Sequence, residues 1–270
     1  MSARLAISLI AALLVGAARG AAFDAFADGE TFTYRASWGL LVHAGDIVIA
    51  AHAEKTPAGI DVVRITTDTS TRGIVRGFYS YNNRAEGLID RQTGRLILMR
   101  EKGTDGRHST DTETVFDYAN SIADFTDHHR PDRSKKVSIP AGDPVDLMSA
   151  LVATRNWDIK PGEKRDVLVN FSDEFLPISI HAERYETVRT PLGEFEALLL
   201  VPRMDQDPRG IFKRGGQIRV WISQNSHKLP VKMQVKLGVV LATLSLSSYQ
   251  PGPAAVPAAA AGSMPQASAR

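Results

Sequence analysis

Two side chains in the middle of the sequence have the spacing of a hydrolytic pair. Asp146 and Ser149 stand three residues apart in a segment with helical periodicity, so both project from one side of a helix. A carboxylate and a hydroxyl that face a cleft could act as base and nucleophile. The alternative, which we favour, is that Asp146 lies near the positive helix end and Ser149 packs on a sheet. We therefore expect a protein that is not an enzyme and has no catalytic residue.

Metal-binding side chains also occur together, in a charged loop that contains Asp124, Asp127, His128 and His129. Adjacent histidines on a strand point to opposite faces, so His128 and His129 cannot readily share one ion. Asp205 and Asp207 resemble part of a calcium loop, but the glycine and the distal glutamate of a full loop are missing. We expect neither a metal nor any other cofactor.

Several side chains could instead line a surface for an apolar ligand. Those that we select are Trp221, Met148, Leu151, Trp38 and Tyr79. Trp221 lies on the face of its strand opposite Ile218, Val220 and Ile222. We favour core packing in a sheet that is covered on both faces over contact with a ligand for this residue.

The long segment 203–216 is charged and rich in glycine. Its basic side chains include Arg209, Lys213 and Arg214. It is either a loop that gates a cavity or touches lipid headgroups, or merely a mobile connection.

Most of the chain has the period-two alternation of β-strands. Val231, Met233 and Val235 alternate with polar residues, which is typical of an antiparallel sheet with one buried face. The apolar set changes phase after Gly238, so this glycine must lie in a bulge or a tight bend. The predicted strands are 31–37, 45–53, 60–69, 76–83, 85–90, 96–102, 112–118, 121–125, 164–172, 175–188, 195–201, 217–223 and 231–246, the last broken at Gly238.

One segment has helical periodicity instead. Leu147, Met148 and Leu151 fall on one apolar stripe, and we expect a helix over about 144–155 with Asp143 as its N-cap and Pro144 in its first turn. The predicted fold is therefore mostly β (α+β): a large curved antiparallel sheet or unclosed β-barrel whose concave side carries one main helix.

The N-terminal segment predicts that the protein is exported from the cytoplasm. Residues 1–22 combine Arg4, an apolar run too short to span a bilayer and small residues near Ala22, as in a cleaved secretory signal peptide. The mature chain then balances 30 basic against 30 acidic residues, which favours no nucleic-acid partner. Residues 251–270 are nearly all Ala, Pro, Gly and Ser and are predicted to be a disordered tail. We expect one domain over 23–250, located in the periplasm and without a transmembrane span.

An ordered set of short motifs runs through most of the mature chain. Its members are Gly45-Asp46, the loop 90–94, the helix 143–157, Thr190-Pro191-Leu192-Gly193-Glu194-Phe195, Val220-Trp221-Ile222-Ser223, and Leu229-Pro230-Val231 with the strand that ends near Gly238. Together they resemble the bacterial exported domain-of-unknown-function family three-one-zero-eight. That resemblance implies an exported envelope protein of unestablished activity, and it transfers no catalytic residue.

A looser resemblance involves only the C-terminal third. The motif 220–223, followed by Leu229-Pro230 and a glycine-broken strand, resembles the periplasmic lipoprotein carriers and their outer-membrane receptors. That resemblance implies an unclosed β-barrel that holds acyl chains under a helix. The absence of cysteine excludes the lipid-anchored receptor type.

Three functions remain open at the level of sequence. The first is an envelope protein that binds or shields an apolar ligand, either a lipid or an acylated protein, on the curved sheet. The second is a non-catalytic scaffold in envelope assembly, and the third is a hydrolase with a site near Asp146 and Ser149. The sequence does not specify the oligomeric state.

Overall fold

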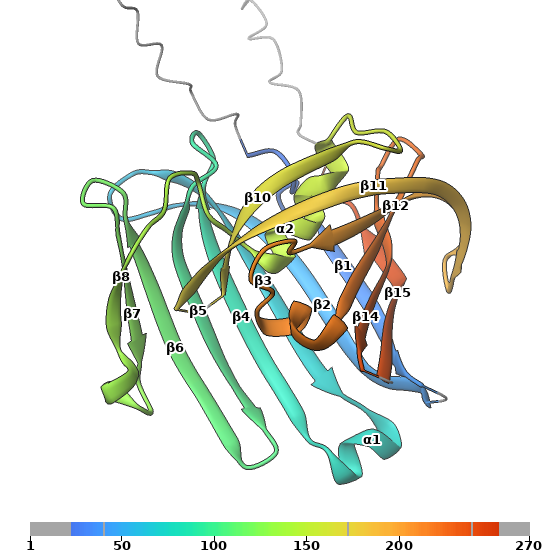
Figure 1. Cartoon of the computed structure of the whole chain (residues 1–270), viewed down its shortest axis with the longest axis horizontal. Coiled ribbons are helices and arrows are strands. Elements are labelled where there is room, and N and C mark those ends of the chain that lie inside the picture. Colours follow the sequence, from blue (N-terminus) through green and yellow to red (C-terminus); the bar gives the residue numbers. More distant parts are fainter. Residues whose placement is uncertain (1–22, 40, 172, 239, 254–270) are drawn as a thin grey trace, which may run out of the picture.

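The computed structural model describes residues 23–39, 41–171, 173–238 and 240–253. The predicted signal peptide and the predicted tail from residue 254 onward lie outside this part of the chain. The described residues form a single sheet of 15 strands, two short α-helices and three 3-10 turns. Figure 1 shows how these elements are arranged.

The first half of the chain contributes nine strands. They are β1 (Thr31–Trp38), β2 (Leu41–Lys55), β3 (Asp61–Thr71), β4 (Tyr81–Asp90), β5 (Leu96–Asp105), β6 (His108–Asp117), β7 (Ile122–Asp127), β8 (Lys135–Ser138) and β9 (Val145–Asp146). The second half contributes β10 (Lys164–Phe171), β11 (Glu174–Thr190), β12 (Gly193–Arg203), β13 (Gln217–Ser223), β14 (Pro230–Leu237) and β15 (Val240–Gln250). The helices are α1 (Gly73–Phe78) and α2 (Leu147–Ala153), and the 3-10 turns are η1 (Pro131–Arg133), η2 (Thr154–Asn156) and η3 (Gly210–Gly215).

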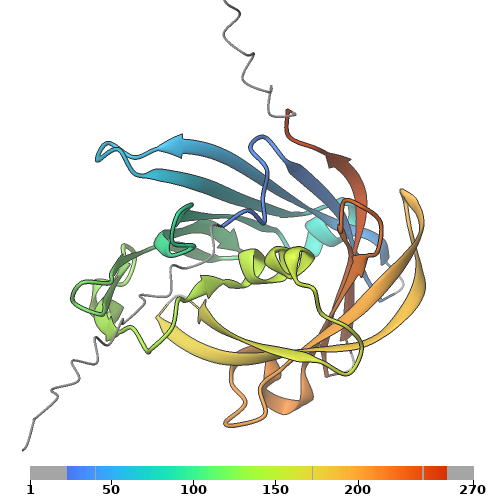
Figure 2. The same ribbon diagram turned by 90° about the horizontal axis from the view of Figure 1, so that it is seen from above.

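The strands form an unclosed barrel, as predicted. Strands that are consecutive in sequence pair with each other, except β8 and β9, and β1 also pairs with β15, so the two halves of the chain join along this seam. The two edges are the short strands β8 and β9, which offer few unpaired backbone groups to another chain. Viewed from above in Figure 2, the sheet curves around α2, which lies on its concave side.

The alternation of side chains explains which face is buried. Ile218, Val220 and Ile222 of β13 point to the concave face and are buried in the core that α2 also joins. The run from Ala197 to Leu200 in β12 is buried at every position, so both faces of this strand are covered. Gly238 adopts a φ of +59° in the tight turn between β14 and β15, where the register pairs Leu237 with Val240.

The main helix differs from its predicted form at its N-terminus. Its N-cap is Asp146 and not Asp143, which instead makes an ion pair with Arg95 at 2.7 Å. Val145 and Asp146 form β9, which pairs with β10 in parallel, so the sheet is mixed at this edge and not wholly antiparallel. The prediction failed here because strand pairing competes with helix formation for the residues before Asp146.

A second helix replaces part of a predicted strand. The alternation around Tyr79 and Tyr81 predicts a strand from residue 76, but the chain forms α1 first and β4 begins at Tyr81. The Arg72 N–H group donates to the Ala44 carbonyl at 2.8 Å. The next residue, Gly73, starts the helix with a φ of +54°. Neither helix of the described ranges has the length and apolar run needed to cross a bilayer.

A buried polar network anchors the end of the α2–η2 segment to the first strands. The Arg155 guanidinium donates to Glu30 Oε1 at 2.7 Å, and Tyr249 donates its hydroxyl to the same oxygen at 2.7 Å. Arg155 also donates to the His227 carbonyl at 2.8 Å and lies over the Phe32 ring. Because Glu30 is 1% exposed, this network joins the helical segment, β15 and the chain before β1 in the dry interior.

Candidate functional site

An apolar pocket opens on the concave face at the end of the barrel that carries α1. We call it the rim pocket. Its volume is about 300 Å³ and its lining is almost wholly apolar. The strand residues that line it include Ala36, Ile47, Thr69, Ala242 and Leu244. Apolar concave pockets of this kind are the usual sites of small hydrophobic ligands.

Aromatic side chains form one wall of the rim pocket. The rings of Trp38 and Tyr79 pack edge to face with centroids 6.4 Å apart, and Tyr79 stacks on Tyr81 at 6.4 Å. A hydrogen bond to Asp105, helped by partial burial, raises the pKa of Tyr79 to about 12. Tyr79 therefore remains neutral at physiological pH, and the wall carries no charge there.

Helix α1 closes one side of this pocket. Val75 is 1% exposed and, like Tyr79 four residues later, lines the pocket. From the sequence we select Trp38 and Tyr79 but not Val75, because the alternation predicts a strand from residue 76 and no helix before it. The i, i+4 spacing of Val75 and Tyr79 was the available signal for a helix.

The other predicted ligand-binding residues lie elsewhere. Leu151 is buried in the core beneath α2, and Met148 packs against the same core. Trp221 points to the convex face, where its indole N–H donates to Glu186 at 2.5 Å and Lys232 lies 5.1 Å from its ring centroid. The structure thus brings together Trp38 and Tyr79 alone among the five selected residues.

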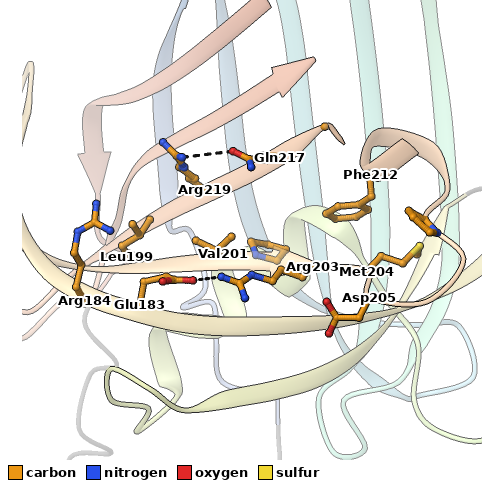
Figure 3. Close-up of a pocket in the computed structure, with 13 residues that line it drawn as sticks. Glu183, Arg184, Leu199, Val201, Arg203, Met204, Asp205, Phe212, Gln217 and Arg219 are labelled. Atoms are coloured by element: carbon orange, nitrogen blue, oxygen red, sulfur yellow. Dashed lines mark hydrogen bonds and ion pairs between the residues drawn. The ribbon is translucent and has the colours of Figure 1, made fainter. Parts of the chain in front are cut away.

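A second pocket, the outer pocket, lies on the convex face between β12, β13 and the segment after β12 (Figure 3). Its volume is about 430 Å³. Leu199 and Val201 lie along its middle, and Phe212 closes one end. Charged groups surround this apolar strip: Arg203 pairs with Glu183, as the dashed line in Figure 3 marks. The outer pocket is consequently less suited to a purely apolar ligand than the rim pocket.

The charged segment 203–216 contributes to the outer pocket. Two of its apolar side chains, Met204 and Phe212, are buried and hold it on the convex face. Arg209 pairs with Asp207, and Lys213 is exposed. The side chain of Arg214 lies outside the described part of the chain. The segment thus lines the outer pocket. That it gates a cavity, touches lipid headgroups or is a mobile connection stays a prediction.

Asp146 and Ser149 have the geometry of a helix cap. Asp146 Oδ1 accepts the backbone N–H groups of Met148 and Ser149, each at 3.0 Å. Oδ2 faces the Gly87 backbone, where an added Cβ would lie 3.3 Å away. Burial raises the pKa of Asp146 above its ordinary value, although the Ser149 hydroxyl and the cap N–H groups act in the opposite direction. Both side chains are enclosed, so this geometry serves helix capping.

The Asp146 cap leads to a prediction about stability and pH. Asp146→Ala should cost about 1 kcal/mol of unfolding free energy, because it removes the cap, whereas Asp146→Asn retains an acceptor oxygen. Because this pKa is raised, the folded protein keeps the Asp146 proton up to a higher pH than the unfolded chain does. Wild-type stability should therefore fall as pH rises from about 4, the ordinary aspartate value, to the raised value in the folded protein.

Urea denaturation of the wild type and both variants at pH 4 and pH 7 measures this effect. Asp146→Asn lacks the titrating group, so its unfolding free energy should rise relative to that of the wild type as pH rises. An equal pH slope in the wild type and Asp146→Asn would contradict the raised pKa.

Asp127, one of the residues considered as metal ligands, holds a turn of the backbone. Asp127 is buried and accepts the backbone N–H groups of His129 and Arg130 at 3.1 and 2.9 Å. It also pairs with the Arg130 guanidinium at 3.1 Å and so orders the turn before η1. No group of three or more potential ligands converges within the described ranges.

Comparisons with known proteins identify one matching family and two aligned solved structures. The family model described as "Protein of unknown function (DUF3108)" matches residues 33–245. Among solved structures, the chain is similar to a beta-barrel-like protein of domain of unknown function DUF1849 from Brucella abortus, with a TM-score of 0.54 and 7% identity over 84% of this chain and 99% of that chain. A proposed lipoprotein from Parabacteroides distasonis aligns with a TM-score of 0.32 and 9% identity over 84% and 98% of the two chains. Comparison with the curated proteins gives no match.

The likeness to the Brucella abortus protein concerns the fold alone, because the identity is only 7%. The family match is more extensive, since it begins within β1 and ends within β15 and so spans nearly the whole sheet. It also confirms the resemblance inferred from the ordered motifs. The chain therefore belongs to the DUF3108 family of proteins of unknown function.

Proposed function

We propose that this protein is a non-catalytic envelope protein that binds or shields an apolar ligand, a lipid or an acylated chain, in the rim pocket. The observation that carries the proposal is an apolar cavity of about 300 Å³ on the concave face, walled by Trp38, Val75 and Tyr79. A filled barrel would offer no such space. Export is supported separately by the apolar segment near the N-terminus.

The chemistry of the pocket wall favours an apolar group over a polar one. Transferring apolar surface from water contributes about 25 cal/mol per Å², so an alkyl chain gains from the dry lining. Asp46 borders the pocket, but its carboxylate is held by Arg72 at 2.9 Å and His43 at 2.7 Å. No free charge of the described lining is available to bind an anionic headgroup inside the pocket, so the headgroup is expected to remain at the mouth.

A fluorescent fatty acid such as dansyl-undecanoic acid tests the proposal in solution. We expect saturable binding with enhanced emission, and native mass spectrometry of the purified protein should detect a co-purified lipid. Ala36→Phe places a ring inside the pocket and should weaken probe binding by on the order of tenfold or more.

A matched substitution controls for changes in stability. Ala50 lies on β2 between the buried residues Ile49 and Ala51, so it points to the convex face, away from the pocket. Ala50→Phe should bind the probe as the wild type does. Absence of saturable binding together with absence of co-purified lipid, or equal weakening by both substitutions, would remove the proposal.

A further inference from the structure

Helix α1 exposes a second apolar face to solvent. Ile74 is 78% exposed and Phe78 is 67% exposed, the highest values among the large hydrophobic side chains of the described residues. They stand four residues apart, so they lie on the same side of this six-residue helix. Paired exposed apolar side chains of this size commonly mark an interaction surface.

This exposed face adjoins the mouth of the rim pocket. Val75 and Tyr79 follow Ile74 and Phe78 in sequence and line the pocket, so α1 is apolar on both sides. Tyr79 packs on Trp38, which is itself 38% exposed. We define the rim patch as Trp38, Ile74, Phe78 and Tyr79. Trp38 and Tyr79 belong both to the patch and to the pocket lining, so the two adjoin. Helix α1 lies at this open end of the barrel (Figure 1).

The ionic groups around the rim patch sum to a net positive charge. Residues 71–80 include Arg72 and Arg76 but no acidic residue. Arg76 donates only to the Thr71 carbonyl and the Asn82 amide oxygen. Arg107 lies in the adjacent turn, where Gly106 N–H bonds to the Ser80 carbonyl at 2.9 Å. No carboxylate of the described residues pairs with Arg76 or Arg107.

Two carboxylates near the rim patch have partners within the protein. Asp46 pairs with Arg72 and His43. Asp105 accepts a hydrogen bond from Tyr79, which does not neutralise its carboxylate, so one negative group stands against the two cationic groups of Arg76 and Arg107. An approaching surface therefore meets apolar side chains flanked by cationic groups. This combination is typical of segments that lie in the interface of an anionic bilayer.

We propose that the rim patch docks on the surface of a phospholipid bilayer that contains anionic lipids. Ile74 and Phe78 enter the headgroup region, while Arg76 and Arg107 contact lipid phosphates. The mouth of the rim pocket then faces the bilayer. A second copy of this chain fits the surface less well. A stable dimer buries about 1,200–2,000 Å², far more than α1 offers, and the unpaired arginines would repel their copies across a two-fold axis.

Sedimentation with sucrose-loaded vesicles tests this inference, which rests on the rim patch and not on ligand binding in the pocket. The full chain should bind vesicles of phosphatidylcholine with phosphatidylglycerol, and added salt should weaken the binding. The double variant Ile74→Ser/Phe78→Ser should bind at least about tenfold more weakly. Arg76→Gln/Arg107→Gln should lose the preference over vesicles of phosphatidylcholine alone. Residues 1–22 are identical in every variant, so they contribute equally.

The matched control removes two exposed apolar side chains outside the rim patch. Ile60 lies in the β2–β3 turn and Leu192 in the β11–β12 turn. Ile60→Ser/Leu192→Ser should bind vesicles like the wild type. The inference is overturned if the wild type does not bind, if the rim-patch variant binds equally well, or if sedimentation velocity detects a dimer that this variant dissociates. The fatty-acid titration contains no vesicles, so the two proposals fail separately.

Discussion

Glu30→Ala is expected to lower the unfolding free energy by about 3–5 kcal/mol, because it leaves a buried guanidinium without its counter-ion. Arg155 is 12% exposed and cannot regain a full hydration shell when Glu30 is removed. The substitution also removes the acceptor for the Tyr249 hydroxyl and for the Ala27 N–H group, which bonds to Oε2 at 3.0 Å. Chemical denaturation followed by circular dichroism measures this loss.

Two comparisons separate the cost of an unpaired charge from the value of the pair. The first is the double variant Glu30→Leu/Arg155→Met, which should recover much of the loss because replacement of a buried pair by apolar groups is often neutral. The second is Asp68→Ala. Its partner Arg84 lies at 2.9 Å, but both side chains are largely exposed, so the change should stay within about 0.5 kcal/mol. If Glu30→Ala costs no more than Asp68→Ala, the network does not anchor the α2–η2 segment.

Local sequence patterns predict the strands of this fold but not the Glu30–Arg155 pair. Most strands follow from alternation, and the bounds of β13 agree with prediction residue for residue. The Glu30–Arg155 contact joins residues 125 positions apart, and neither residue has a neighbour in sequence that indicates the other. Such pairing depends on how the sheet curves in three dimensions. It is therefore a property of the fold and not of any window of sequence.

The errors in secondary structure have the same origin. Asp143 and Pro144 have helix-starting chemistry, yet Val145 and Asp146 pair with β10 as β9, and the helix begins only at Leu147. The segment 76–80 alternates like a strand, yet α1 forms where Val75 and Tyr79 can contact the concave face. In both places tertiary contacts outweigh a local preference that is worth less than about 1 kcal/mol per residue.

The candidate site was only partly predictable for a related reason. Trp38 and Tyr79 were selected as aromatic residues in an apolar sheet, and the barrel brings them together at its open end. Trp221 was selected on the same grounds, but its phase on β13 places it on the convex face. Alternation separates the two faces of a strand, whereas the direction in which the sheet curves decides which face becomes a pocket.

That curvature leads to the last prediction, which concerns two glycines that border close contacts between strands. At Gly45 of β2, an added Cβ would lie 2.5 Å from the Ser70 carbonyl oxygen of β3. At Gly103 of β5, it would lie 2.5 Å from the Asn82 carbonyl oxygen of β4. Real Cβ atoms do not approach so closely, so a side chain at either position must push neighbouring strands apart. Gly45→Ala and Gly103→Ala should each cost about 1–3 kcal/mol of unfolding free energy.

Gly77 of α1 provides the matched control, because an added Cβ meets nothing within 4 Å there and its φ is not positive. Gly77→Ala removes backbone freedom from the unfolded chain and should stabilise the protein by about 0.5–1 kcal/mol. Gly45 also lines the rim pocket, so Gly45→Ala should weaken fatty-acid binding, whereas Gly103→Ala should affect stability alone. Equal stability of the wild type and Gly45→Ala would mean that β2 and β3 separate at little cost. The tight bend of the sheet would then not depend on glycine.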